Sequence, residues 1–191
     1  MIHNTFKHGP EGWCSYDYHA SMVADGTNVF ILATQSATDG PEGTGCVWTD
    51  HRRWSADTPE SPLSILPLLH YRSWVDAEPI DLRDTQMSAW LRGDNLQLDG
   101  ASCYFWVHAS GTRWHLTDQP LSIADGTWTK QQVLLEPTPE RWHCSWSVDP
   151  DQPTLLAKVL SSVHSYGFSF VGFSRQVTGR LSLAGFKLHQ P

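Results

Sequence analysis

The stretch SCYFWVHASGTRWHLT, residues 102–117, decides the fold class. Two short runs rich in aromatic and β-branched residues, 102–109 and 112–117, flank a Ser-Gly turn signal at Ser110. Similar runs recur along the chain, at 28–34, 45–49, 86–92, 127–135, 143–148, 167–173 and 179–188. The turn pairs between them start at Asp25, Asp39, Gly93, Asp99 and Asp125. Short strands joined by regularly spaced turns predict an all-β fold, either an antiparallel sandwich or a barrel.

One segment near the C-terminus is typical of an amphipathic helix instead. In PTLLAKVLSSVH, residues 153–164, apolar side chains recur at helical spacing. Pro153 suits a first helical turn, and Gly167 lies just past the end. We expect one short helix that packs over an edge or end of the sandwich. Its apolar stripe comprises Leu155, Leu156, Val159, Leu160 and Val163.

The least regular segment is 49–74, which three prolines interrupt, Pro59, Pro62 and Pro67. We predict a long irregular loop here. Because binding groups often sit on loops held by a rigid sheet, this segment is a candidate for ligand contact.

Length and charge narrow the function classes. The 191 residues predict a single domain, 1–191. A formal net charge of −7 argues against nucleic acid and against a polybasic contact with a membrane, because both need a positive field. The chain shows neither an apolar run long enough to span a membrane nor an apolar leader region. We expect a cytoplasmic protein, or an extracellular one if the chain was cut from a longer secreted protein.

Cysteine and tryptophan usage adds two expectations. Cys14, Cys46, Cys103 and Cys144 form no CxxC pair, so we expect free thiols that act as small core residues and no zinc knuckle. The ten tryptophans exceed what the core of a chain this size needs. The excess indicates a recognition surface.

Strand alternation sorts side chains by face. In 102–109, Cys103, Phe105 and Val107 share one face and are predicted to be core. Tyr104, Trp106 and His108 share the other face, which is either a stacking platform or a second face covered by a loop or the helix.

The same alternation applies to 112–116 and 141–148, two runs that each contain Arg, Trp and His in succession. In 141–148 we expect Trp142, Cys144, Trp146 and Val148 in the core, with the polar residues between them facing solvent or ligand. In 112–116, Trp114 and Leu116 share one face, and the other face carries Arg113 and His115.

The common catalytic and phosphate-binding motifs are missing from the sequence. The glycine-rich segment 39–45 is predicted to be a hairpin loop. Asp50, Asp57 and Glu60 lie close together with His51 and could supply the acid and base of a glycosidase, or form a solvated loop with local Asp-Arg pairs. The scattered histidines do not predict a metal site. We expect no cofactor, or a structural Ca²⁺ held by Asp side chains and loop carbonyls.

The C-terminal third carries a resemblance to a known family. Residues 156–188 run LAKVLSSVHSYGFSFVGFSRQVTGRLSLAGFKL, a helix or turn, a strand, a Thr-Gly turn and a closing strand, and ADGTWTKQQVLLEP precedes them at 124–137. As a pattern of strands over 81–188, this resembles jelly-roll, galactose-binding-like carbohydrate-binding modules. The closing strand has Leu183, Ala184 and Gly185 where such modules usually carry an Asp that helps to hold calcium, which puts that calcium site in doubt.

The resemblance implies non-catalytic binding of oligo- or polysaccharide. Sugars stack their C–H faces on aromatic rings and exchange hydrogen bonds with Arg, His, Asp and Gln. The alternatives are a polysaccharide-acting hydrolase or lyase on the same fold, and a protein-interaction domain that meets a larger parent protein or a partner subunit. The predicted ligand-binding residues are Trp48, Trp54, Tyr71, Arg72, Trp74, Tyr104, Trp106, His108, Arg113 and His115, with Trp54, Trp74, Trp106, His108 and Arg113 preferred.

Overall fold

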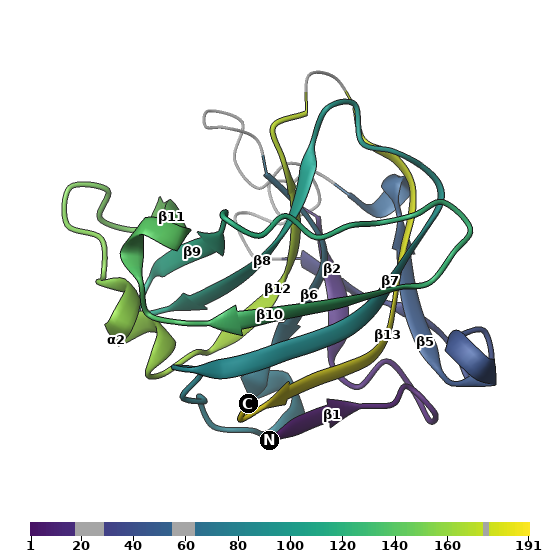
Figure 1. Ribbon diagram of the computed structural model, residues 1–191, viewed down its shortest axis with the longest axis horizontal. Coiled ribbons are helices and arrows are strands. Elements are labelled where there is room, and N and C mark those ends of the chain that lie inside the picture. Colours follow the sequence, from purple (N-terminus) through teal and green to yellow (C-terminus); the bar gives the residue numbers. More distant parts are fainter. Residues whose placement is uncertain (18–28, 55–63, 174–175) are drawn as a thin grey trace.

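Two antiparallel sheets stack face to face in a computed structural model that describes residues 1–17, 29–54, 64–173 and 176–191 (Figure 1). The six-stranded sheet has the order β10-β7-β13-β5-β4, with β1 paired to β13. The seven-stranded sheet has the order β11-β9-β8-β12-β6-β2-β3. The strands are β1 (Ile2–Asn4), β2 (Trp13–Asp17), β3 (Val29–Leu32), β4 (Thr34–Ser36), β5 (Cys46–Asp50), β6 (Ser64–Tyr71), β7 (Thr85–Gln97), β8 (Ser102–Ala109), β9 (Thr112–Leu116), β10 (Thr129–Leu135), β11 (Trp142–Ser147), β12 (Ser165–Val171) and β13 (Thr178–His189). The helical elements are α2 (Leu156–Leu160) and the 3₁₀ turns η1 (Pro41–Gly43), η2 (His51–Arg53), η3 (Arg72–Val75) and η4 (Pro139–Arg141). The predicted antiparallel sandwich is confirmed, and the described residues contain the one short helix that was expected near the C-terminal strands.

Aromatic side chains join the two sheets across the core. The ring of Phe186, on β13 of the six-stranded sheet, lies 4.9 Å from that of Trp13 and 5.4 Å from that of Tyr166, both on the seven-stranded sheet. Phe105 and Phe168 complete this fully buried group. Large rings that contact one another at offset and edge-on angles stabilise the stacking of the sheets.

The stretch that opened the sequence analysis forms the β8–β9 hairpin, with Ala109 paired to Thr112. Its face assignment is confirmed, because Cys103, Phe105 and Val107 lie in the core between the sheets. Segment 39–45 is the predicted hairpin loop, since it joins β4 to β5, which pair with each other.

The prediction of an irregular loop over 49–74 is wrong for β6, which is a buried strand between β12 and β2. Pro67 concealed it. The ladder to β12 shifts register between Phe168 and Phe170, so Pro67 sits at a bulge, where its missing N–H does not interrupt a hydrogen-bonded pair. The short strands β1 and β2 were not expected either.

The helix is shorter than predicted and is confined to five residues, Leu156–Leu160. It lies at one end of the sandwich beside β8 and β9, and Leu156, Val159 and Leu160 are buried there (Figure 1). Leu155 is 76% exposed, so its assignment to the buried stripe is wrong. It precedes the first turn in an extended conformation and points away from the core.

A bulge in β11 corrects a second face assignment. Trp142 is buried as predicted, but the register with β9 shifts between Cys144 and Trp146. The extra residue turns the rest of the strand over, so Trp146 is 37% exposed and Val148 is 70% exposed. The expectation that these two residues belong to the core is wrong.

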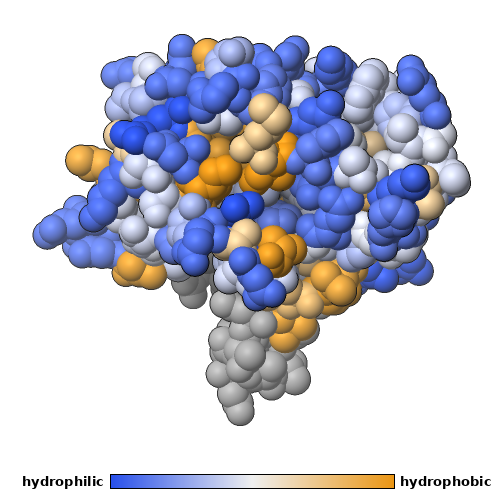
Figure 2. Space-filling view, turned by 90° about the horizontal axis from the view of Figure 1, so that it is seen from below, coloured by the Kyte–Doolittle hydropathy of each residue, from blue (hydrophilic) through white to orange (hydrophobic). Residues whose placement is uncertain are grey.

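The cysteines are free thiols, and Cys14, Cys46 and Cys103 are buried as expected, while Cys144 is half-buried. No helix within the described ranges is long and apolar enough to cross a membrane. Seen from below, the surface is mainly hydrophilic, and its hydrophobic residues gather in several patches near the middle of the view (Figure 2).

Candidate functional site

The outer face of the seven-stranded sheet carries most of the residues that the sequence nominated. Tyr104, Trp106 and His108 follow one another along β8, and Arg113 and His115 lie beside them on β9. Tyr104 and His108 line two separate hollows, and their backbones are about 13 Å apart along the strand. The candidate site therefore runs along β8 from one hollow to the other.

The larger hollow, which we call the groove, has a volume of about 820 Å³. Tyr71 at the end of β6, His108 on β8 and His164 just before β12 supply its aromatic rings. Polar groups surround these rings on η3 and the segment after it. The groove is lined by Tyr71, Arg72, Ser73, Asp76, Ala77, Glu78, Pro79, His108, Ser110 and His164.

Two tryptophans flank the groove through contacts with its rings. Trp74 packs on Tyr71 with ring centroids 5.0 Å apart and is 43% exposed. Trp146 lies 6.0 Å from His108. The groove thus has an aromatic residue beyond each ringed wall, an arrangement suited to a flat ligand with apolar faces and polar edges.

The smaller hollow, which we call the pocket, has a volume of about 100 Å³ and lies at the other end of β8. Tyr104, His143 and Ser145 line it together with His115. The side chain of His115 is 2% exposed, and its Nε2 has no hydrogen-bond partner among the described residues. A buried ring nitrogen without a partner beside a hollow is free to bond a ligand hydroxyl.

Burial keeps His108 and His115 uncharged at neutral pH. It lowers the pKa of His108 to about 4, helped by the nearby Arg113 guanidinium. Burial also lowers the pKa of His115 well below its usual range, again with a contribution from Arg113. A neutral imidazole carries one donor and one acceptor nitrogen, which matches a hydroxyl better than an imidazolium does.

The middle of β8 is closed. Trp106 is 2% exposed, its indole N–H donates to the Phe168 carbonyl, and Arg113 covers its ring at 5.8 Å. Of the two readings that the sequence left open, Trp106 fits the covered face. Arg113 is itself 8% exposed and donates to Ser145 Oγ. Trp106 and Arg113 support the site from beneath.

The ten tryptophans fall into two groups, according to whether the indole N–H donates a hydrogen bond within the described residues. Six donate to another residue of the protein: Trp13, Trp54, Trp106, Trp114, Trp128 and Trp142. Four donate to no described residue: Trp48, Trp74, Trp90 and Trp146. Trp74 and Trp146 flank the groove, whereas Trp48 and Trp90 face outward from the six-stranded sheet.

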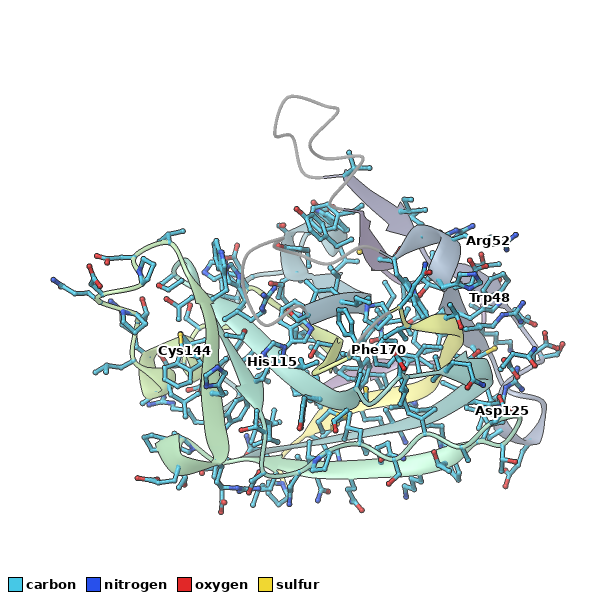
Figure 3. The ribbon with its side chains drawn as sticks, turned by 90° about the horizontal axis from the view of Figure 1, so that it is seen from above. Trp48, Arg52, His115, Asp125, Cys144 and Phe170 are labelled. Carbon is cyan, nitrogen blue, oxygen red and sulfur yellow. The ribbon has the colours of Figure 1, made fainter. Side chains whose placement is uncertain are left out.

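The structure separates Trp48 and Trp54 from the other predicted ligand-binding residues. Trp48 lies on the six-stranded sheet, well separated from His115 (Figure 3). The guanidinium of Arg180 lies 3.8 Å from the centre of the Trp48 ring. Trp54 packs edge-on against Phe170 and donates to Thr49 Oγ1. Trp54 and Trp106, two of the preferred residues, are built into the fold.

The structure describes two of the four residues proposed as an acid–base cluster, Asp50 and His51. Arg52 donates two hydrogen bonds to Asp50, and these bonds hold the pKa of that carboxyl at about 2. His51 is bonded to the backbone of Gly179, so the ring is anchored. Asp57 and Glu60 lie outside the described residues. Where side chains are described, no group of three or more His, Cys, Asp or Glu could hold a metal ion.

Several residues of the site were missed from the sequence. Trp146 was assigned to the core because the bulge in β11 leaves no sequence signal. His143 and Ser145 were recognised only as a polar row. Tyr16 and Phe30, which extend the aromatic surface beside Tyr71, lie on a strand pair that was only half predicted.

Comparison with known proteins adds the fold family. Neither a protein-family model nor a curated protein sequence matches this chain. Among solved structures, the CBM22-1 xylan-binding domain of Xyn10C from Paenibacillus barcinonensis matches with a TM-score of 0.52 and 10% identity, over 98% of this chain and 92% of that one. The family 11 carbohydrate-binding module of the cellulase Lic26A-Cel5E of Clostridium thermocellum matches with a TM-score of 0.50 and 8% identity, over 83% and 82%. A solution structure of CtCBM11 gives 0.51 and 10%, over 83% of each chain.

The fold is the jelly roll of carbohydrate-binding modules. The resemblance inferred from the C-terminal third therefore extends over most of the chain. At these identities the likeness establishes the architecture, and the ligand has to be argued from the side chains of this protein.

Proposed function

We propose that this protein binds a neutral oligo- or polysaccharide, without catalysis, on the outer face of the seven-stranded sheet. The observation that carries the proposal is the groove, with Tyr71 and His108 in its walls and beyond them Trp74 and Trp146, whose indole N–H groups donate to no residue that the structure describes. Rings supply stacking surfaces for sugar C–H groups, and the unbonded indole N–H groups can donate to sugar oxygens.

The electrostatics of the groove favour an uncharged ligand. Two carboxylates, Asp76 and Glu78, line it against one guanidinium, Arg72, and the whole chain carries a net charge of −7. Carboxylates accept hydrogen bonds from sugar hydroxyls but repel acidic sugars. The neutral ring of His108 adds no positive charge. Xylan is the first ligand to test, because a xylan-binding domain shares the fold.

The pocket is proposed as a second contact for the same chain of sugars. It lies about 13 Å further along β8 than the groove. There the Nε2 of His115, which has no partner among the described residues, would bond one sugar hydroxyl, and the Tyr104 ring would pack against the sugar ring. A ligand that reaches both hollows must contain several sugar units, so affinity should rise with chain length and then level off.

The test is a titration of intrinsic tryptophan fluorescence with xylan and other neutral polysaccharides, with and without Ca²⁺. Each mixture is assayed for new reducing ends. We expect a saturable change in emission and no new reducing ends. New reducing ends would contradict the non-catalytic proposal, and silence with every neutral polysaccharide would contradict the ligand class.

A pair of variants assigns the binding to this face. Trp146→Ala removes an exposed ring beside the groove and should weaken binding at least about tenfold, the effect of a residue worth about 1.4 kcal/mol. Trp48→Ala is the matched control, since it removes a partly exposed ring from the opposite face. Equal losses in both variants would argue against the groove.

We further propose that the chain acts as a module beside other domains, in a secreted protein that acts on polysaccharides. The likeness to modules of polysaccharide-degrading enzymes supports this. The test is to measure the mass of the native protein in the culture medium and in the cytosol. A longer protein in the medium would support the proposal, and a protein of 191 residues found only in the cytosol would contradict it.

A further inference from the structure

The outer face of the six-stranded sheet also carries tryptophans, and most of them are covered by cations. The guanidinium of Arg180 lies 3.8 Å from the centre of the Trp48 ring, and that of Arg92 lies 4.8 Å from Trp128. Both contacts are close enough for cation–π attraction. These two rings are therefore occupied by the protein's own side chains.

Trp90 on β7 differs from its neighbours. Among the described residues, neither a cation nor a second ring lies against it, and its N–H has no partner. It is half-buried and lines a hollow of about 340 Å³. An aromatic ring left open in the wall of a hollow is available for a ligand.

A bulge in β13 keeps the ring open. The register with β7 shifts between Ala184 and Lys187, which places Gly185 beside Trp90 with a positive φ of 54°. A Cβ at Gly185 would lie 3.4 Å from Trp90 Cδ1, so any longer side chain there would spread over the indole. The glycine both permits the left-handed backbone and leaves the hollow empty.

Two lysines flank the strand that carries Trp90. Lys130 on β10 is directly opposite Trp90, and Lys187 on β13 is opposite Ser88, one pleat away on the same face. Both lysines line the hollow. Neither forms an ion pair within the part of the chain that the structure describes.

The hollow is therefore a positive spot on an acidic protein. On the same face, Arg92 is paired with Asp94, and Arg180 lies over the ring of Trp48. Around the hollow the only carboxylate among the lining residues is Glu42, against two lysines. An open ring with two unpaired cations beside it suits a ligand that has an apolar face and a negative charge.

We propose that this hollow is a second carbohydrate site that binds a uronic acid residue. The sugar ring lies on Trp90, and its carboxylate is held between the ammonium groups of Lys130 and Lys187. The site goes beyond the function proposed above, because it lies on the opposite sheet and recognises charge, whereas the groove recognises a neutral chain. On a polysaccharide with neutral and acidic units, one protein molecule would bind neutral units with its groove, and another would bind acidic units with this hollow.

The test compares two probes that differ only in charge, tetragalacturonate and its fully methyl-esterified form, by titration calorimetry at low and raised salt. We expect the acid form to bind and the ester to bind about five- to tenfold more weakly, since each exposed lysine–carboxylate pair contributes modestly. Raised salt should weaken the acid form alone. Equal affinity for both probes, or no binding of the acid form, would overturn the proposal.

Variants locate the site. Lys130→Met with Lys187→Met changes two exposed side chains, which leaves folding intact, and should bring the acid form down to the affinity of the ester. Trp90→Ala should reduce binding of the acid form at least about tenfold. Trp146→Ala, on the groove, should leave tetragalacturonate binding unchanged, and a loss there would place the acid sugar in the groove instead. Displacement of the sugar by inorganic phosphate alone would show a general anion site and overturn the assignment to sugar.

Discussion

Lowering the pH from 7.5 to 5 should destabilise the folded protein through two buried histidines, His70 and His115, and the partly buried His108. Burial lowers the pKa of His70 and of His108 to about 4 and that of His115 well below its usual value. In the unfolded chain each imidazole returns to a pKa of about 6.5. Between these values the unfolded state binds protons that the folded state does not, so stability falls as the pH falls.

The size of the effect follows from the width of that interval. At pH 5 the unfolded pKa lies about 1.5 units above the pH, which corresponds to about 2 kcal/mol for each imidazole at 1.36 kcal/mol per unit. Three such residues together give about 6 kcal/mol. That is a large share of the 5–15 kcal/mol of a typical domain, so the protein should be close to unfolding near pH 5.

Urea unfolding at pH 7.5, 6.5, 5.5 and 5 measures this directly. Carboxylates with a lowered pKa do not contribute to the change between pH 5 and 7.5. The pKa of Asp50 is about 2 in the folded state and near 4 in the unfolded chain, so its contribution to stability is fully present above about pH 5 and is lost only at lower pH. The variant His108→Gln removes one of the three proton sites and should reduce the loss between pH 7.5 and 5 by about one third. A free energy of unfolding that stays constant across this range would refute the reasoning.

Three further predictions concern packing and binding. Trp13→Ala empties the centre of the aromatic core and leaves Asn4 Oδ1 without its donor, so calorimetry should show a loss of about 4 kcal/mol or no cooperative unfolding at all. Gly167→Ala places a Cβ 2.4 Å from the Leu68 carbonyl oxygen and should cost about 1–3 kcal/mol in urea unfolding, whereas Gly9→Ala, which meets nothing within 4 Å, should cost less than about 0.5. In a His143→Gln/His164→Gln variant, which removes the other two histidines that line the hollows, binding of the neutral glycan should change less than about twofold between pH 6 and 8, because His108 and His115 stay neutral; a tenfold change would show that one of these two imidazoles binds in its charged form.

Strand alternation in unbroken runs predicted well. Residues 102–109 gave the strand, its core face and the outward positions of Tyr104 and His108, because the ladder around β8 has no irregularity. The resemblance of the last third to carbohydrate-binding modules also rested on unbroken runs. The two apolar runs at 167–173 and 179–188, separated by a Thr-Gly turn, correspond to β12 and β13.

Bulges account for the main errors. A bulge in β11 exposed Trp146, a bulge opposite Pro67 allowed a strand where proline argued for a loop, and a bulge in β13 opened the hollow beside Trp90. Each inserts one residue and reverses the faces beyond it, and only the partner strand decides where it falls. Periodicity within a single run does not contain that information.

Burial was the second quantity that the sequence could not supply. Trp54 and Trp106 are of a residue type suited to binding, but both rings are packed and both N–H groups are bonded within the fold. Trp74 and Trp146 are the same residue type, but their N–H groups donate to no residue in the described part of the chain. Residue type nominated the candidates, and hydrogen bonding separated the structural tryptophans from the available ones.

The most direct test of binding on the seven-stranded sheet is the indole N–H region of a ¹⁵N NMR spectrum, recorded while xylohexaose is added. The ten tryptophans give ten signals, which single substitutions assign. The account predicts that the signals of Trp74 and Trp146 shift in a saturable way, while those of Trp48 and Trp90 on the other sheet stay in place. Shifts confined to Trp48 and Trp90, with Trp74 and Trp146 unmoved, would contradict it.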